Sequence, residues 1–195
     1  EAFVDDAAAA LDFLRAHPRL DARRLAVAGH SEGGLIALEL ANGPAAGLRT
    51  VVLLATPGRP IGAVLQDQLT LALEKQSATG PQTAEILAQN ERILAEIERT
   101  GVVPVDVPAG LRALYPPYLG SFLRSLARLD PAVRARTARV PILALHGGAD
   151  IQASPEKDGG AIRAALATRS DGSGQITLSD INHALQAATD VSGER

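Results

Sequence analysis

Short apolar runs, separated by longer segments with helical spacing, are the main pattern of this sequence. Four runs are continuous and rich in valine, leucine, isoleucine and alanine, and turn residues bound several of them, which is typical of buried strands. They lie at residues 24–28, 50–55, 141–145 and 175–178. Strands without polar alternation are characteristic of a parallel sheet that is covered on both faces.

Helical segments alternate with these strands. Apolar residues recur at spacings of three and four along residues 2–17, and similar segments follow the first strand (35–41) and the third (156–167). A last helix is expected at residues 184–189. Strands that alternate with helices predict an α/β fold with a mostly parallel sheet and crossover helices.

Residues 57–139 interrupt this alternation, because no strand is predicted there. Helices are expected at residues 61–76, 81–100, 111–115 and 118–129. Each helix has a single apolar face, so each needs another surface to pack against. We therefore expect a helical cap, residues 57–139, inserted into an α/β core formed by residues 1–56 and 140–195.

Composition excludes several classes of function. The chain has 195 residues, of which 46% are hydrophobic and 21% charged, as in an ordinary globular protein. A net charge of -3 and only 3% aromatic residues argue against nucleic-acid binding, which needs a concentrated basic face. The absence of cysteine excludes disulfides and a thiol nucleophile. No apolar run approaches the roughly 18–20 residues of a membrane span.

A G-x-S-x-G motif lies between the first predicted strand and the helix that follows it. In that context the serine, Ser31, sits on a sharp turn that presents its hydroxyl above the sheet. Gly29 and Gly33 are expected to avoid side-chain clashes, and His30 to pack in the turn or line a pocket. The amide of Glu32, at the start of the helix, is expected to face a developing oxyanion. A tight turn that merely carries a serine is the alternative.

A serine nucleophile needs a base, and two histidines follow Ser31 in the chain. His183 lies in the loop after the last predicted strand, from which an imidazole can reach back over the sheet. His146 closes the third strand, where a packed histidine is expected. We therefore predict that His183 is the base.

The base in turn needs a carboxylate that orients it. Asp150 follows the third strand after two glycines, at the carboxyl edge of the sheet where such sites collect. Asp180 competes for this role, but it lies too close in sequence to His183 to hold the ring from the far side. A helix cap near Ser154 is the alternative role for Asp150, and the Glu32 carboxylate is expected to be structural.

Four segments resemble the α/β-hydrolase fold, and in particular bacterial esterases related to the serine aminopeptidases and acyl-thioesterase-like hydrolases. Residues 29–34 are similar to the serine turn of these proteins, 118–131 to the end of their cap, 140–152 to their strand and acid loop, and 181–186 to their histidine loop. Ala184 and Leu185 replace a bulkier pair in the last segment. The resemblance covers essentially the whole chain.

This resemblance implies a triad with Ser31 as nucleophile, Asp150 as acid and His183 as base, and no metal or cofactor. It implies cleavage of a small-molecule ester, with an apolar acyl group, through an acyl-enzyme intermediate. Within the cap, candidate pocket walls are Tyr115, Tyr118 and Phe122, although cap-core packing is their alternative. Peptide or thioester hydrolysis by the same triad, and a non-catalytic binding module, are the alternative functions.

The resemblance also implies a larger sheet, because the family has eight strands and this sequence predicts the last four. The strand at residues 24–28 would then have an unpaired apolar edge, and such an edge favours pairing with a strand of another segment or chain. We expect the N-terminal half of the hydrolase, or a second chain, to cover that edge. The loop that normally donates the second oxyanion N–H is also expected to come from that half.

Overall fold

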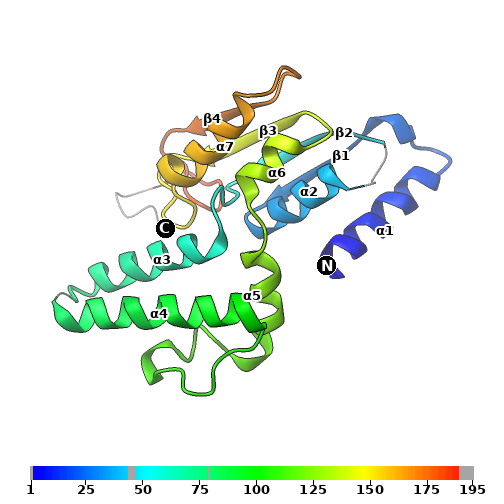
Figure 1. The fold of residues 1–195 in the computed structure, drawn as a ribbon. Helices are drawn as coiled ribbons and strands as arrows, with labels where there is room; N and C mark the ends of the chain where they lie inside the picture. The colour runs from blue at the N-terminus through cyan, green and yellow to red at the C-terminus, as the bar shows by residue number, and fades with distance from the viewer. Residues whose placement is uncertain (1, 44–46, 79, 189–195) are drawn as a thin grey trace. The chain divides into compact units, whose positions relative to one another are not determined.

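The computed structural model describes residues 2–43, 47–78 and 80–188 and divides into two compact units (Figure 1). Glu1–Arg59 and Asp130–Arg195 form the first unit, and Pro60–Leu129 forms the second. No helix of the described ranges is long and apolar enough to cross a membrane.

The first unit contains a four-stranded parallel sheet, as the sequence predicts. Its strands lie within about two residues of the predicted runs: β1 Leu25–His30, β2 Leu48–Leu54, β3 Ile142–Gly147 and β4 Gly174–Leu178. Their order in the sheet is their order in the chain, with β1 and β4 on the outside. The α/β fold class is therefore confirmed, and the carboxyl ends of all four strands meet at one edge.

Helices of the first unit pack on the sheet and on each other: α1 Ala2–Ala16, α2 Glu32–Asn42, α6 Pro131–Thr137 and α7 Gly160–Leu166. Single 3-10 and π-helical turns precede β1 (Ala22–Arg24) and α7 (Pro155–Gly159). α2 contacts β1 and β2, α6 contacts α2 and α7, and α7 contacts β4. Crossovers between parallel strands are right-handed as a rule, so α2, α6 and α7, which lie between strands in sequential order, are expected on one face of the sheet.

Burial differs between the two faces of the sheet. On the helix-covered face the strand residues Val51, Leu53, Ile142, Ala144 and His146 are fully buried. On the other face Leu143, Ile176 and Leu178 remain 39%, 49% and 37% exposed. Within the described ranges, therefore, only one face is covered, whereas the apolar strands predict cover on both.

α6 belongs to the first unit, although the sequence pattern assigned its residues to the insertion. The Asp130 side chain accepts the Val133 N–H at 3.0 Å and so caps the helix. Arg134 forms an ion pair with Glu39 at 2.7 Å, and its carbonyl accepts a hydrogen bond from Asn42 at 2.8 Å. These contacts to α2 explain why the second unit ends at Leu129 and the first unit resumes at Asp130. The short helix lacks a long periodic pattern, so the sequence did not reveal it.

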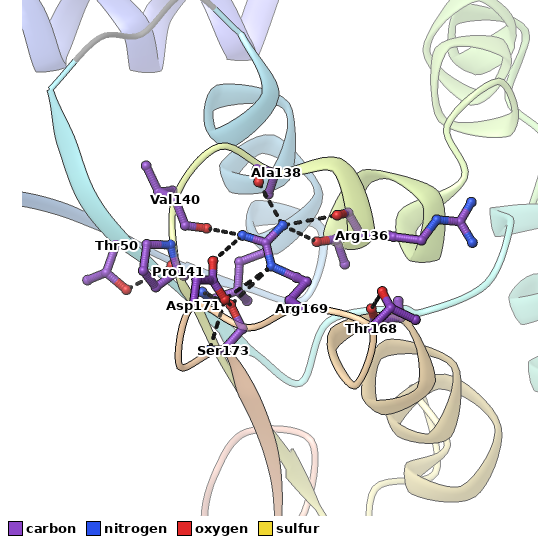
Figure 2. A network of polar contacts seen from close by, with 12 residues as sticks. Thr50, Arg136, Ala138, Val140, Pro141, Thr168, Arg169, Asp171 and Ser173 are labelled. Atoms are coloured by element: carbon purple, nitrogen blue, oxygen red, sulfur yellow. Dashed lines mark hydrogen bonds and ion pairs between the residues drawn. The ribbon is translucent and has the colours of Figure 1, made fainter.

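Arg169 joins several segments of the first unit (Figure 2). Its guanidinium, on a side chain only 10% exposed, donates to four backbone carbonyls at 2.7–3.1 Å: those of Ala135, Arg136, Ala138 and Val140. It also pairs with Asp171, and this contact lowers the pKa of the Asp171 carboxyl below its usual range. A cation thereby meets the unpaired carbonyls at the end of α6, where it is favourable.

The second unit is helical and has a hydrophobic core of its own. It contains α3 Ile61–Lys75, α4 Pro81–Thr100 and α5 Gly120–Ala127, with 3-10 turns at Ala109–Leu111 and Pro117–Leu119. The buried core residues are Ile93, Ile97, Val103, Val107, Leu111, Tyr115 and Leu123. As the sequence predicts, Pro81 begins α4 and Gly101 ends it, in a left-handed conformation.

Candidate active site

Ser31 lies in a strained turn between β1 and α2. Its φ of 53° and ψ of -121° are rare for a residue with a side chain. The Ser31 N–H donates to the Leu54 carbonyl at 2.8 Å, so the pairing of β1 with β2 continues into the turn. The backbone of the serine is therefore held by the sheet at the carboxyl end of β1.

Gly29 and Gly34 permit this turn, because a side chain at either position would clash. The sequence predicted such a constraint at Gly29 and at Gly33. An added Cβ on Gly29 would lie 2.1 Å from the Gly33 carbonyl oxygen. On Gly33 it would meet no described atom within 4 Å beyond its chain neighbours and the nearby backbone of its own helix, so the expected clash does not occur there. On Gly34 it would lie 1.8 Å from Thr56 Oγ1. Gly34, rather than Gly33, thus allows α2 to approach the loop after β2.

The structure brings His183 between Ser31 and Asp150. His183 Nε2 lies 3.1 Å from Ser31 Oγ, and His183 Nδ1 lies 2.9 Å from Asp150 Oδ2. The other oxygen of the buried Asp150 accepts the backbone N–H groups of Gln152 and Ala153 at 2.8 and 2.9 Å. The carboxylate is thereby fixed by the loop after β3 and faces the imidazole.

His183 lies in a compact turn, where the sequence pattern predicted the start of a helix at residue 184. Ile181 pairs with Ala187 in an antiparallel bridge, and Leu185 has a left-handed φ of 59°. This helix prediction is wrong for residues 184–188, and residue 189 lies outside the described ranges. The polar side chain of Asn182 stabilises the turn instead, because its Oδ1 accepts the Gln186 N–H at 3.0 Å.

The alternative acid and base occupy other positions. His146 is fully buried, and its Nε2 lies 2.9 Å from the Thr56 carbonyl oxygen, so it packs between β3 and the loop after β2. Asp180 is exposed, and its carbonyl accepts the Ala188 N–H at 2.7 Å within the turn. The ring of His183 therefore meets Asp150 rather than Asp180.

His30 contacts the histidine turn, a role that the sequence did not reveal. Its Nε2 lies 2.7 Å from the His183 carbonyl oxygen, and the two imidazole rings are 5.0 Å apart. Glu32, on the other side of Ser31, is half-buried, and burial raises the pKa of the Glu32 carboxyl.

The three aromatic candidates of the second unit differ in environment. Tyr115 is buried in the core, where its hydroxyl donates to Asn90 Oδ1, and burial raises the pKa of Tyr115 to about 12. Tyr115 thus takes the alternative role of core packing. Phe122 packs against the same core, whereas Tyr118 is 79% exposed.

Metal-ligating side chains do not cluster in the described part of the chain, where no group of three or more could hold an ion. In the same described residues, a hydroxyl, an imidazole and a carboxylate lie in one hydrogen-bonded line.

A protein-family model described as serine aminopeptidase, S33 (Hydrolase_4) matches residues 1–184. The chain belongs to this family. Among curated relatives of this S33 chain, esterase EstD of Thermotoga maritima is 30% identical over 155 residues, which are 80% of this chain and 33% of EstD. The chain therefore spans about a third of that relative.

Solved structures share the fold of this S33 family chain. A puromycin-hydrolysing peptidase of Mycobacterium tuberculosis superposes with a TM-score of 0.58 and 18% identity, over 97% of this chain and 23% of the peptidase. The esterase domain of a Rhodothermus marinus protein superposes with a TM-score of 0.54 and 19% identity. The match covers 97% of this chain and 63% of the esterase domain. The fold of this chain is thus shared by an esterase domain and a peptidase.

Proposed function

We propose that the protein hydrolyses carboxylic esters of small molecules, with Ser31 as nucleophile, His183 as general base and Asp150 as the acid that orients the base. The single observation that supports this proposal best is the line of contacts from Ser31 Oγ through the His183 ring to Asp150, at 3.1 and 2.9 Å. Both distances are within hydrogen-bond reach, as this chemistry requires.

Acylation begins when Ser31 Oγ attacks the ester carbonyl and its proton moves to His183 Nε2. The Nδ1–H of His183 donates to Asp150, which leaves Nε2 free to accept this proton and stabilises the imidazolium that forms. The carbonyl oxygen becomes an oxyanion, which we assign to the backbone N–H of Glu32. The tetrahedral intermediate then collapses, the alcohol leaves with the proton from Nε2, and Ser31 carries the acyl group.

Deacylation repeats these steps with water. His183 Nε2 takes a proton from water as the water oxygen attacks the acyl carbonyl. When the Ser31 ester bond breaks, the same proton returns to Oγ and the carboxylic acid departs. The acyl group is apolar in this proposal, and the helical insertion, expected at residues 57–139, serves as the cap; no step requires a metal or cofactor.

Peptide hydrolysis is the second candidate, because the family is described as serine aminopeptidase and a solved relative is a puromycin-hydrolysing peptidase. The same triad can attack an amide. Turnover of p-nitrophenyl butyrate, aminoacyl p-nitroanilides and acyl thioesters, compared on the full-length protein, distinguishes the substrate classes.

Ser31→Ala in the full-length protein tests the nucleophile. We expect turnover of p-nitrophenyl butyrate to fall at least about 10³-fold and labelling by a fluorophosphonate probe to disappear, because alanine cannot form the acyl-enzyme. Ser125→Ala removes an exposed serine of α5 and is the matched control, which should label normally. Labelling of Ser31→Ala at the wild-type rate would refute the assignment, and no labelling of the folded wild type would favour a binding module.

A further inference from the structure

Two adjacent residues of the serine turn contact the same histidine. Ser31 Oγ lies 3.1 Å from the ring nitrogen Nε2 of His183, and His30 Nε2 lies 2.7 Å from the backbone carbonyl oxygen of His183. The side chain and the main chain of residue 183 are thus both attached to the end of β1.

The main-chain attachment lies between two parts of the turn whose hydrogen bonds, among the described residues, differ in reach. Before residue 183 the turn is fixed to the first unit, because the Ala149 N–H donates to the Ile181 carbonyl at 3.0 Å and Asn182 is buried. After it, the Leu185 and Gln186 N–H groups donate to the carbonyl and side chain of Asn182, within the turn itself. The contact from His30 therefore links this second part of the turn to β1.

The geometry points to His30 as a positioning residue for His183, a role that rests on the proposed function. A carbonyl oxygen only accepts, so His30 Nε2 carries the proton and is the donor in this hydrogen bond. Its hydrogen bond orients the peptide plane after His183 and so aims Nε2 of that ring at Ser31 Oγ. Small displacements of a general base reduce the rate of the chemical step more than they reduce substrate binding.

Two substitutions at this position separate the donor from the ring. His30→Phe keeps a ring of similar size but has no N–H. His30→Gln restores a donor, and its amide nitrogen is the same number of bonds from Cβ as Nε2 of histidine. His17→Phe, which removes a histidine just after α1, before β1 begins, is the matched control.

The experiment measures kcat and KM for p-nitrophenyl butyrate and the downfield proton resonance of His183 Nδ1–H, all on the full-length protein. We expect His30→Phe to lower kcat about tenfold with KM within about twofold, and to broaden or shift the resonance. His30→Gln should restore both to near the wild-type values, and His17→Phe should change neither.

Unchanged kcat and an unchanged resonance in His30→Phe would overturn the inference, and so would His30→Gln behaving like His30→Phe. The resonance also separates the two proposals. If the wild type turns over no ester, the proposed function fails, while a broadened or shifted resonance in His30→Phe and its return to the wild-type position in His30→Gln would still establish the positioning contact.

Discussion

Ser31, His183 and Asp150 show how far single residues could be predicted from the sequence. The motif around Ser31 and the positions of the other two after predicted strands were enough to choose them, and the structure brings their side chains within hydrogen-bond reach. Their catalytic roles remain predictions. The contact of His30 could not be foreseen, since a bond from a side chain to a backbone carbonyl 153 residues away leaves no local pattern.

Gly34 was also missed at the residue scale, because its constraint comes from Thr56 on another segment. Gly34→Ala should destabilise the protein by about 1–3 kcal/mol, since the new Cβ would overlap the fully buried side chain of Thr56. Gly33→Ala is the matched control, which should be neutral or stabilising, because alanine favours a helix over glycine. Urea unfolding of the full-length variants measures the difference, and equal free energies of unfolding would contradict the close contact between α2 and Thr56.

Elements with a long periodic pattern were predicted well, and short ones were not. α4 followed from its apolar spacing together with Pro81 and Gly101 at its ends. α6 was missed because its seven residues are too few for a periodic signal, and its stability comes from α2 and Arg169. The helix predicted from residue 184 is replaced by a turn. Its helical pattern is weak, and the hydrogen bonds of Asn182 within the turn outweigh it.

Arg169→Lys tests the contribution of one side chain to several elements. Lysine keeps the charge but cannot direct a planar fork at four carbonyls, so we expect a loss of about 1–3 kcal/mol in the free energy of unfolding. Arg163→Lys, on the exposed side of α7, should change it by less than about 0.5 kcal/mol. Chemical denaturation of both variants compares them, and a loss at residue 169 no larger than at 163 would show that the carbonyl contacts add little.

At the scale of the whole molecule, the four strands form a sheet with helices on one face. The remaining face carries Leu143, Ile176 and Leu178, and β1 pairs with β2 alone in the described ranges. The partner that we expect at the β1 edge, an N-terminal half of the hydrolase or a second chain, remains a prediction. The sequence could not show which face is covered, because apolar strands look the same in either case.

The 195-residue chain by itself should therefore associate in solution. We expect light scattering to give a mass above that of the 20.2 kDa monomer, and a fluorescent apolar dye to bind, because a free strand edge and exposed apolar side chains favour both. Ile176→Lys should reduce dye binding, and Val105→Lys, a fully exposed position of the second unit, is the control for added charge. A stable monomer that binds no dye would contradict the exposed edge and face.

The separate core of residues 60–129 has a consequence for how the sheet assembles. β2 and β3 are neighbours in the sheet, yet the whole second unit lies between them in the chain. Closing a long flexible loop costs conformational entropy that grows with its length. A segment that forms a hydrophobic core of its own is not a flexible loop, so we expect the entropy cost of bringing β3 to β2 to be lower than the length of the segment alone would give.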